Sequence, residues 1–121
     1  MNGKHLSALR GAVRCENSAD DIREQVSGLY DCLLEKNHLE EADIVSLVFS
    51  QTKDLDAQNP ASALRQSGRA ENLALFAVQE TETADALPRV IRTLVHCYLP
   101  ESTTPCHVYC NGAEVLRPDR T

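Results

Sequence analysis

Two helix-start signals separate the apolar segments of this chain and limit the folds it can adopt. The run SADD beginning at Ser18 has the form of a capping box, and apolar residues then recur every three or four positions. Asn59 before Pro60 pairs an N-cap with proline in the first helical turn, and Gly68 is the matching stop. The sequence therefore predicts a long first helix, ending near Asn37, and a short second helix.

Apolar segments with strand character flank both helices. In residues 6–14 the side chains alternate between two faces, with Arg10 between two alanines. Residues 44–50 are apolar enough to form a central strand. Asn111-Gly112 is a type I′ hairpin signal. The predicted strands are residues 6–14, 44–50, 73–79, 106–110 and 113–117.

The segment from Leu87 to Pro100 is predicted to form a third helix, which is amphipathic. This helix would place Arg89 and His96 toward water and Arg92 at the border between core and solvent. The residues that share its apolar arc are Leu87, Val90, Ile91, Leu94, Val95 and Tyr98. The predicted order is then β-α-β-α-β-α-β-β. We expect one α+β domain over residues 1–121, with a five-stranded mixed sheet and its helices on one face.

Composition narrows the function classes. The net charge is −6 and no Lys/Arg run occurs, so a nucleic-acid or anionic-membrane surface is not expected. No apolar stretch has transmembrane length. Five cysteines without a CxxC pair indicate reduced thiols and a cytoplasmic protein. Cys106, His107 and Cys110 match no standard zinc spacing, so we expect no metal site.

Several charged residues lie where periodicity does not assign them to a solvated face. The excess of arginine among them suits planar, bidentate recognition of carboxylates. No catalytic triad and no glycine-rich phosphate loop is evident. Sequence patterns alone thus predict a small α+β domain with a site for a carboxylate ligand. The candidate residues are Arg10, Arg65, Glu80, Arg92 and Arg117, together with Tyr109.

Short motifs over nearly the whole chain add a family resemblance. They are LRGAV (9–13), NPASALR (59–65), QE (79–80), LPRVIR (87–92), HVY (107–109) and VLRPD (115–119). In this order and spacing the chain resembles the monofunctional trimeric chorismate mutases of the α/β-barrel class. The resemblance implies a Claisen rearrangement of chorismate to prephenate in aromatic amino-acid biosynthesis, without cofactor or metal. It also implies a homotrimer with a barrel-like core and clefts between subunits.

The resemblance also implies roles for individual residues. Arg10 would bind a substrate carboxylate, with Tyr109 hydrogen-bonded to the same end. Arg92 would contact the ether oxygen and a carboxylate, and Glu80 would accept a hydrogen bond from the ring hydroxyl. The remaining members line the cleft. They are Ala61 and Arg65 from the adjacent subunit, Ala77 beside the ring, and Leu116 and Arg117 on the C-terminal side.

The sequence departs from the family pattern at Asn59, Ser62, Phe76 and Ala77. Ala77 stands where a hydroxyl or thiol is frequent, so Glu80 would hold the ring hydroxyl with less help. Two other functions stay open. One is a trimeric small-carboxylate-binding or imine-processing protein with a similar barrel trimer, which the combination of Arg92 and Glu80 disfavours. The other is a catalytically inactive interaction subunit.

Overall fold

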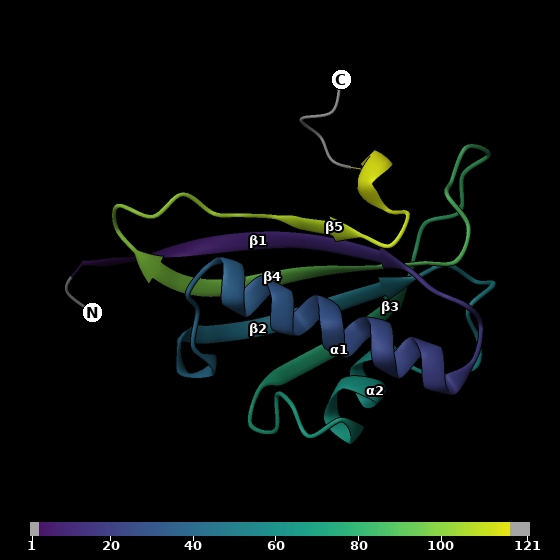
Figure 1. Cartoon of the computed structure of the whole chain (residues 1–121), viewed down its shortest axis with the longest axis horizontal. Helices are drawn as coiled ribbons and strands as arrows, with labels where there is room; N and C mark the ends of the chain where they lie inside the picture. The colour runs from purple at the N-terminus through teal and green to yellow at the C-terminus, as the bar shows by residue number, and fades with distance from the viewer. Residues whose placement is uncertain (1–2, 117–121) are drawn as a thin grey trace.

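A computed structural model describes residues 3–116 as one five-stranded mixed sheet with two α-helices (Figure 1). The strand order across the sheet is β3-β2-β4-β1-β5. Strand β4 is antiparallel to both of its neighbours, whereas β5 runs parallel to β1 and β3 parallel to β2. In chain order the elements are β1 (Lys4–Arg14), α1 (Ala19–Lys36), β2 (Ile44–Gln51), α2 (Pro60–Gln66), β3 (Ala74–Gln79), β4 (Val90–Pro100) and β5 (Val108–Cys110), with short 3-10 turns at Glu41–Asp43 and Glu114–Leu116.

The first two of the three predicted helices are confirmed, together with their caps. The Ser18 hydroxyl accepts a hydrogen bond from the Asp21 N–H at 3.1 Å, which satisfies a free donor at the start of α1. The Asn59 side chain accepts from the N–H groups of Ala61 and Ser62, and Pro60 follows it directly. Gly68 has a φ of 87°, which ends α2 in the left-handed region that glycine tolerates best.

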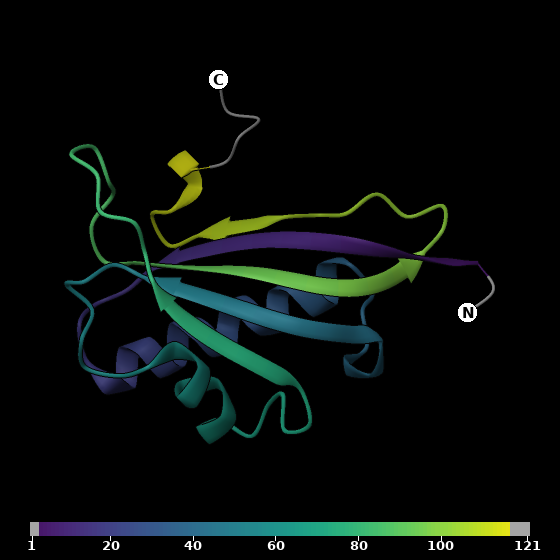
Figure 2. The same cartoon turned by 180° about the vertical axis from the view of Figure 1, so that it is seen from behind.

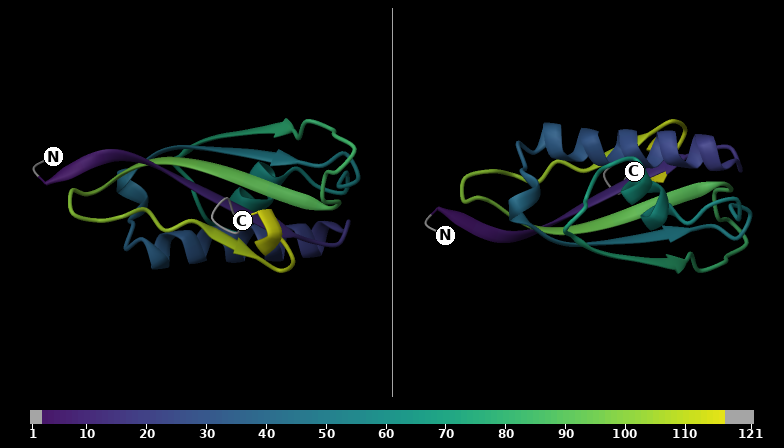
Figure 3. Two further views of the ribbon diagram at one scale, coloured as in Figure 1. Left: turned by 90° about the horizontal axis from the view of Figure 1, so that it is seen from above. Right: turned by 90° about the horizontal axis from the view of Figure 1, so that it is seen from below.

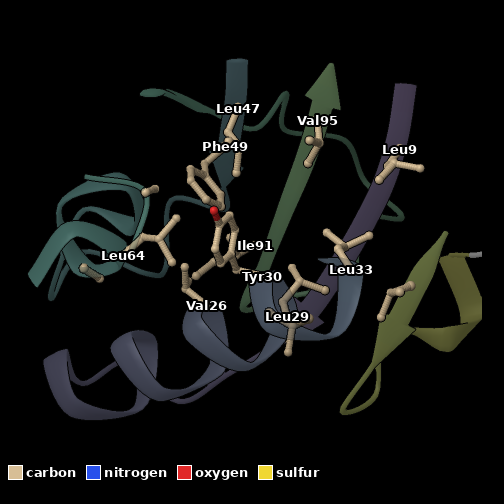
Figure 4. Close-up of a cluster of buried hydrophobic side chains, with 14 of the residues drawn as sticks. Leu9, Val26, Leu29, Tyr30, Leu33, Leu47, Phe49, Leu64, Ile91 and Val95 are labelled. Atoms are coloured by element: carbon tan, nitrogen blue, oxygen red, sulfur yellow. The ribbon is translucent and has the colours of Figure 1, made fainter. Parts of the chain in front are cut away.

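The core lies between one face of the sheet and the two helices (Figures 3 and 4). Apolar side chains of α1 and α2 meet Leu47 and Phe49 of β2 and the inward residues of β1 and β4. Gly11 permits this close packing, because a Cβ atom there would lie 3.2 Å from the Cδ1 atoms of Leu29 and Leu33. In Figure 2 the strands lie in front of α1, and among residues 3–116 no helix covers the opposite face.

The predicted third helix is wrong, because Val90–Pro100 is strand β4, the middle strand of the sheet. Its odd-numbered residues from Ile91 to Leu99 are buried against the helices. The other face also has apolar side chains, including Leu94. Apolar residues from the two faces together produce the three- and four-residue spacing that is typical of an amphipathic helix. The β-branched and aromatic content of the segment favours a strand, and pairing on both edges stabilises it.

The predicted last strand is also wrong. Asn111 and Gly112 both have positive φ, at 52° and 96°, as the hairpin signal requires. The residues after them form a 3-10 turn at Glu114–Leu116, because Ala113 is buried against Ala12 and Val90. Strand β5 therefore pairs with β1, not with a following strand. The five-strand count was right because β4 takes the place of the missing strand.

Candidate active site

Strand alternation places the candidate residues on the uncovered face of the sheet. Even-numbered residues of β1, β3, β4 and, from Ser46 onward, β2 point away from the helices there, and Tyr109 does so on β5. The strand register aligns them in two neighbouring rows. One row is Val78, Ser50, Arg92, Ala12 and Tyr109, and the next is Phe76, Val48, Leu94 and Arg10. Ala12, between Arg92 and Tyr109 in the first row, is fully buried in a small cluster that Tyr109 packs against.

Glu80 reaches this face from just beyond the end of β3. Its N–H donates to the Gln51 carbonyl at 2.8 Å, which continues the β2–β3 ladder by one residue. The Ser50 hydroxyl donates to Oε1 of Glu80. The Nε atom of Arg92 lies 3.7 Å from that same oxygen, too far for a good hydrogen bond. Ser50 and Arg92, which are neighbours in the first row, thus form one polar group with Glu80.

These side chains surround a cleft of about 390 Å³. Two of its polar atoms, Nε of Arg92 and the hydroxyl oxygen of Tyr109, are buried without a hydrogen-bond partner within residues 3–116. A buried donor without a partner costs free energy, so such groups usually serve a ligand or a strained site. The polar residues lining the cleft include Arg10, Ser50, Glu80, Arg92 and Tyr109.

Arg10 is fixed by its backbone on the edge of β1. Its N–H donates to Nδ1 of His107 at 2.9 Å, just before β5 begins at Val108. The imidazole nitrogen therefore acts as the acceptor that a further residue of β5 would otherwise supply. The side chain of Arg10 remains exposed at the cleft. Together, Arg10 and Arg92 give the cleft two cationic groups, and Glu80 gives it one carboxylate. This arrangement suits an anionic ligand that also has a hydroxyl group.

The other predicted site residues that the structure describes do not line this cleft. Ala61 and Ala77 pack partly buried against the helix-side core. Arg65 donates to the carbonyls of Ala70, Glu71 and Leu73, which organises the loop after α2. Leu116 packs in the small cluster beside Tyr109. Arg117 lies outside the described residues.

Two contacts in the site were missed by the sequence reasoning. The sequence predicts Ser50 only as the end of a strand, and it presents His107 only as a weak metal-ligand candidate and as part of the motif HVY. Each contact joins residues that are 30 or more positions apart, so local periodicity could not reveal them. The signal available was the polar Ser50 at the end of the apolar segment IVSLVFS.

Cysteine binds metal ions as the thiolate. Burial raises the pKa of the Cys97 and Cys110 thiols, which favours their protonated form. In the part of the chain that the structure describes, no group of three or more His, Cys, Asp or Glu residues could hold a metal ion.

Neither helix within residues 3–116 combines the length and the apolar character that a membrane span requires.

The known proteins that this chain resembles are chorismate mutases. The family model for chorismate mutase type I matches residues 6–120. The chorismate mutase AroH of Bacillus subtilis is 30% identical over 117 residues, covering 94% of this chain and 91% of the relative. The chorismate mutase AroH of Thermus thermophilus is 33% identical over 120 residues, covering 94% and 95%. A solved chorismate mutase from Clostridium thermocellum superposes with a TM-score of 0.80 at 38% identity, covering 90% of this chain and 98% of the other. The chain belongs to the chorismate mutase type I family.

Proposed function

We propose that this chorismate mutase converts chorismate to prephenate in the cleft beside β1, β2 and β4, with Arg10, Glu80, Arg92 and Tyr109 contacting the substrate. The supporting observation is the pair of buried, unpartnered donors, Nε of Arg92 and the Tyr109 hydroxyl, which line one cleft with Arg10 and Glu80. A dicarboxylate with an ether oxygen and a ring hydroxyl supplies acceptors for these donors. It also supplies a hydroxyl donor for Glu80.

A pericyclic rearrangement needs no nucleophile and no proton transfer, so electrostatics and positioning supply the catalysis. The C–O bond breaks ahead of C–C bond formation, and negative charge grows on the ether oxygen. A guanidinium held beside that oxygen stabilises the transition state more than the substrate. Arg92 is suited to this role because its partner Glu80 is 3.7 Å away and leaves the guanidinium available.

The same reaction requires the flexible enolpyruvyl side chain to fold over the ring. Arg10 and Tyr109 would bind the carboxylate at one end, while Glu80 would accept a hydrogen bond from the ring hydroxyl at the other. Holding both ends converts binding energy into a reactive conformation. The cleft volume of about 390 Å³ is sufficient for a ligand of this size.

The enzyme would act as a homotrimer with a barrel-like core. The uncovered sheet face exposes large apolar side chains, which monomers rarely leave in contact with water. These side chains are Leu6, Phe76, Val78 and Leu94, at 60%, 65%, 42% and 37% exposure. Ala61 and Arg65 lie on the helix side of their own chain, so they would reach a cleft only in a neighbouring subunit. Leu116 and Arg117 would close that cleft, and Ala77 would contribute packing beneath it.

The reaction places the enzyme in aromatic amino-acid biosynthesis, with chorismate as its small-molecule partner. We further propose a cytoplasmic location, because all five cysteines are free thiols and two of them are fully or almost fully buried.

Prephenate formation from chorismate is the direct test, and turnover without added metal or cofactor is expected. Light scattering should report a trimer. Phe76→Glu places a charge on the uncovered face and should reduce both trimer and activity. Glu24→Lys, on the exposed side of α1, is the matched control and should change neither. A wild-type monomer that still forms prephenate would overturn the trimer and its interfacial clefts. A trimer that forms no prephenate would overturn the activity.

A further inference from the structure

We propose that Ser50 is a positioning residue that holds the Glu80 carboxylate for the substrate and keeps it from pairing with Arg92. The inference rests on the proposed role of Glu80 and assigns a function to a residue outside that proposal. Ser50 lines the cleft, and its hydroxyl donates to Oε1 of Glu80.

The strand geometry brings these groups together. Ser50 is the register partner of Arg92 across β2 and β4, and of Val78 across β2 and β3. Glu80 lies two residues after Val78, so its side chain returns to the same face. The backbone of the central strands therefore places Ser50 next to Arg92 and next to the strand that leads to Glu80. The position of Ser50 does not depend on the loop that follows Glu80.

The Glu80 carboxylate could either bind the substrate hydroxyl or pair with Arg92, and the contact with Ser50 favours the first of these. Nε of Arg92 lies 3.7 Å from Oε1, close enough for attraction but outside good hydrogen-bond distance. If Glu80 rotated to pair fully with Arg92, the guanidinium would be less available to the ether oxygen. A neutral donor from Ser50 satisfies Oε1 without that loss. Within residues 3–116, Oε2 accepts no side-chain hydrogen bond, so it remains for a ring hydroxyl.

Single variants give the first test. Ser50→Ala should lower kcat/KM by about 10-fold to 100-fold, the range expected for a lost hydrogen bond to a charged group. Ser50→Thr keeps the hydroxyl and should remain within about 3-fold of wild type. Ser46→Ala is the matched control, since Ser46 lies on the same strand four residues earlier, beside His96 and outside the cleft. It should leave the activity unchanged.

A double-mutant cycle separates positioning from a general structural role. If Ser50 acts through Glu80, adding Ser50→Ala to Glu80→Ala should lower kcat/KM by less than about 2-fold. A structural loss would instead be additive in the two backgrounds. Additive effects, or a fully active Ser50→Ala beside an impaired Glu80→Ala, would overturn the positioning role alone. A fully active Glu80→Ala would overturn the proposed role of Glu80 and this inference with it.

Discussion

Replacing Arg92 with alanine is the sharpest test of how the cleft works. Arg92 is proposed to meet negative charge that develops on the ether oxygen in the transition state. Losing one such donor costs about 3–4 kcal/mol, so Arg92→Ala should lower kcat by roughly 10²–10³. Arg92→Lys keeps the positive charge but not the planar fork of donors, and it should also be severely impaired.

The structure predicts that this loss comes without a matching loss of stability. The ion pair of Arg92 and Glu80 spans 3.7 Å, and the two side chains are 41% and 23% exposed. A partly exposed pair of this kind contributes at most about 1 kcal/mol after solvent screening. Removing Arg92 also removes its buried, unpartnered Nε, which offsets part of that contribution. The free energy of unfolding should therefore change by less than about 1 kcal/mol.

Arg89 provides the control within the same segment. It lies just before β4, outside the cleft, and its guanidinium pairs with Glu16 at 2.8 Å on the surface. Arg89→Ala should leave kcat nearly unchanged, with a stability cost of at most about 1 kcal/mol. Steady-state kinetics and urea unfolding of both variants test the reasoning. Similar losses of kcat in Arg89→Ala and Arg92→Ala would refute it.

Two further changes are predicted. Tyr109→Phe removes a buried hydroxyl that has no partner in the described chain, so kcat/KM should fall by about 10-fold while thermal stability stays equal or rises. A marked drop in melting temperature would contradict this. Asn37 is buried and bonds the Leu33 carbonyl and both backbone groups of Cys106. Asn37→Ala should therefore cost about 2–3 kcal/mol in urea unfolding, and a cost below about 0.5 kcal/mol would show that these bonds are dispensable.

Local chemistry was enough to predict the two helices. Ser18 and Asn59 satisfy free N–H groups through atoms only two or three residues away, and Gly68 adopts its left-handed conformation for local reasons. The apolar segment that became β2 is likewise recognisable by itself. The short motifs that this chain shares with a known family then indicated the reaction and the residues proposed to perform it.

Tertiary packing determined the secondary structure of a segment whose sequence pattern fits both a helix and a strand. Residues 90–100 satisfy a helical arc and a strand equally well in sequence, because apolar side chains occur on both faces of β4. Hydrogen-bonding edges on β1 and β2 select the strand, and these edges exist only in the folded sheet. The placement of Arg92 at the border of a helix was therefore wrong, although its place in the cleft follows from strand alternation.

The sequence by itself determined the capped helices, the polar and apolar alternation of β1 and the set of charged residues available for a ligand. Only the tertiary structure decided that Ser50 contacts Glu80, that His107 accepts from the backbone of Arg10, and that Arg65 organises its own loop. The physical reason is the distance along the sequence between the residues that form each contact. Caps and turns are satisfied within a few residues, whereas these contacts depend on strand register, which packing on the helix-covered face fixes for the open face as well.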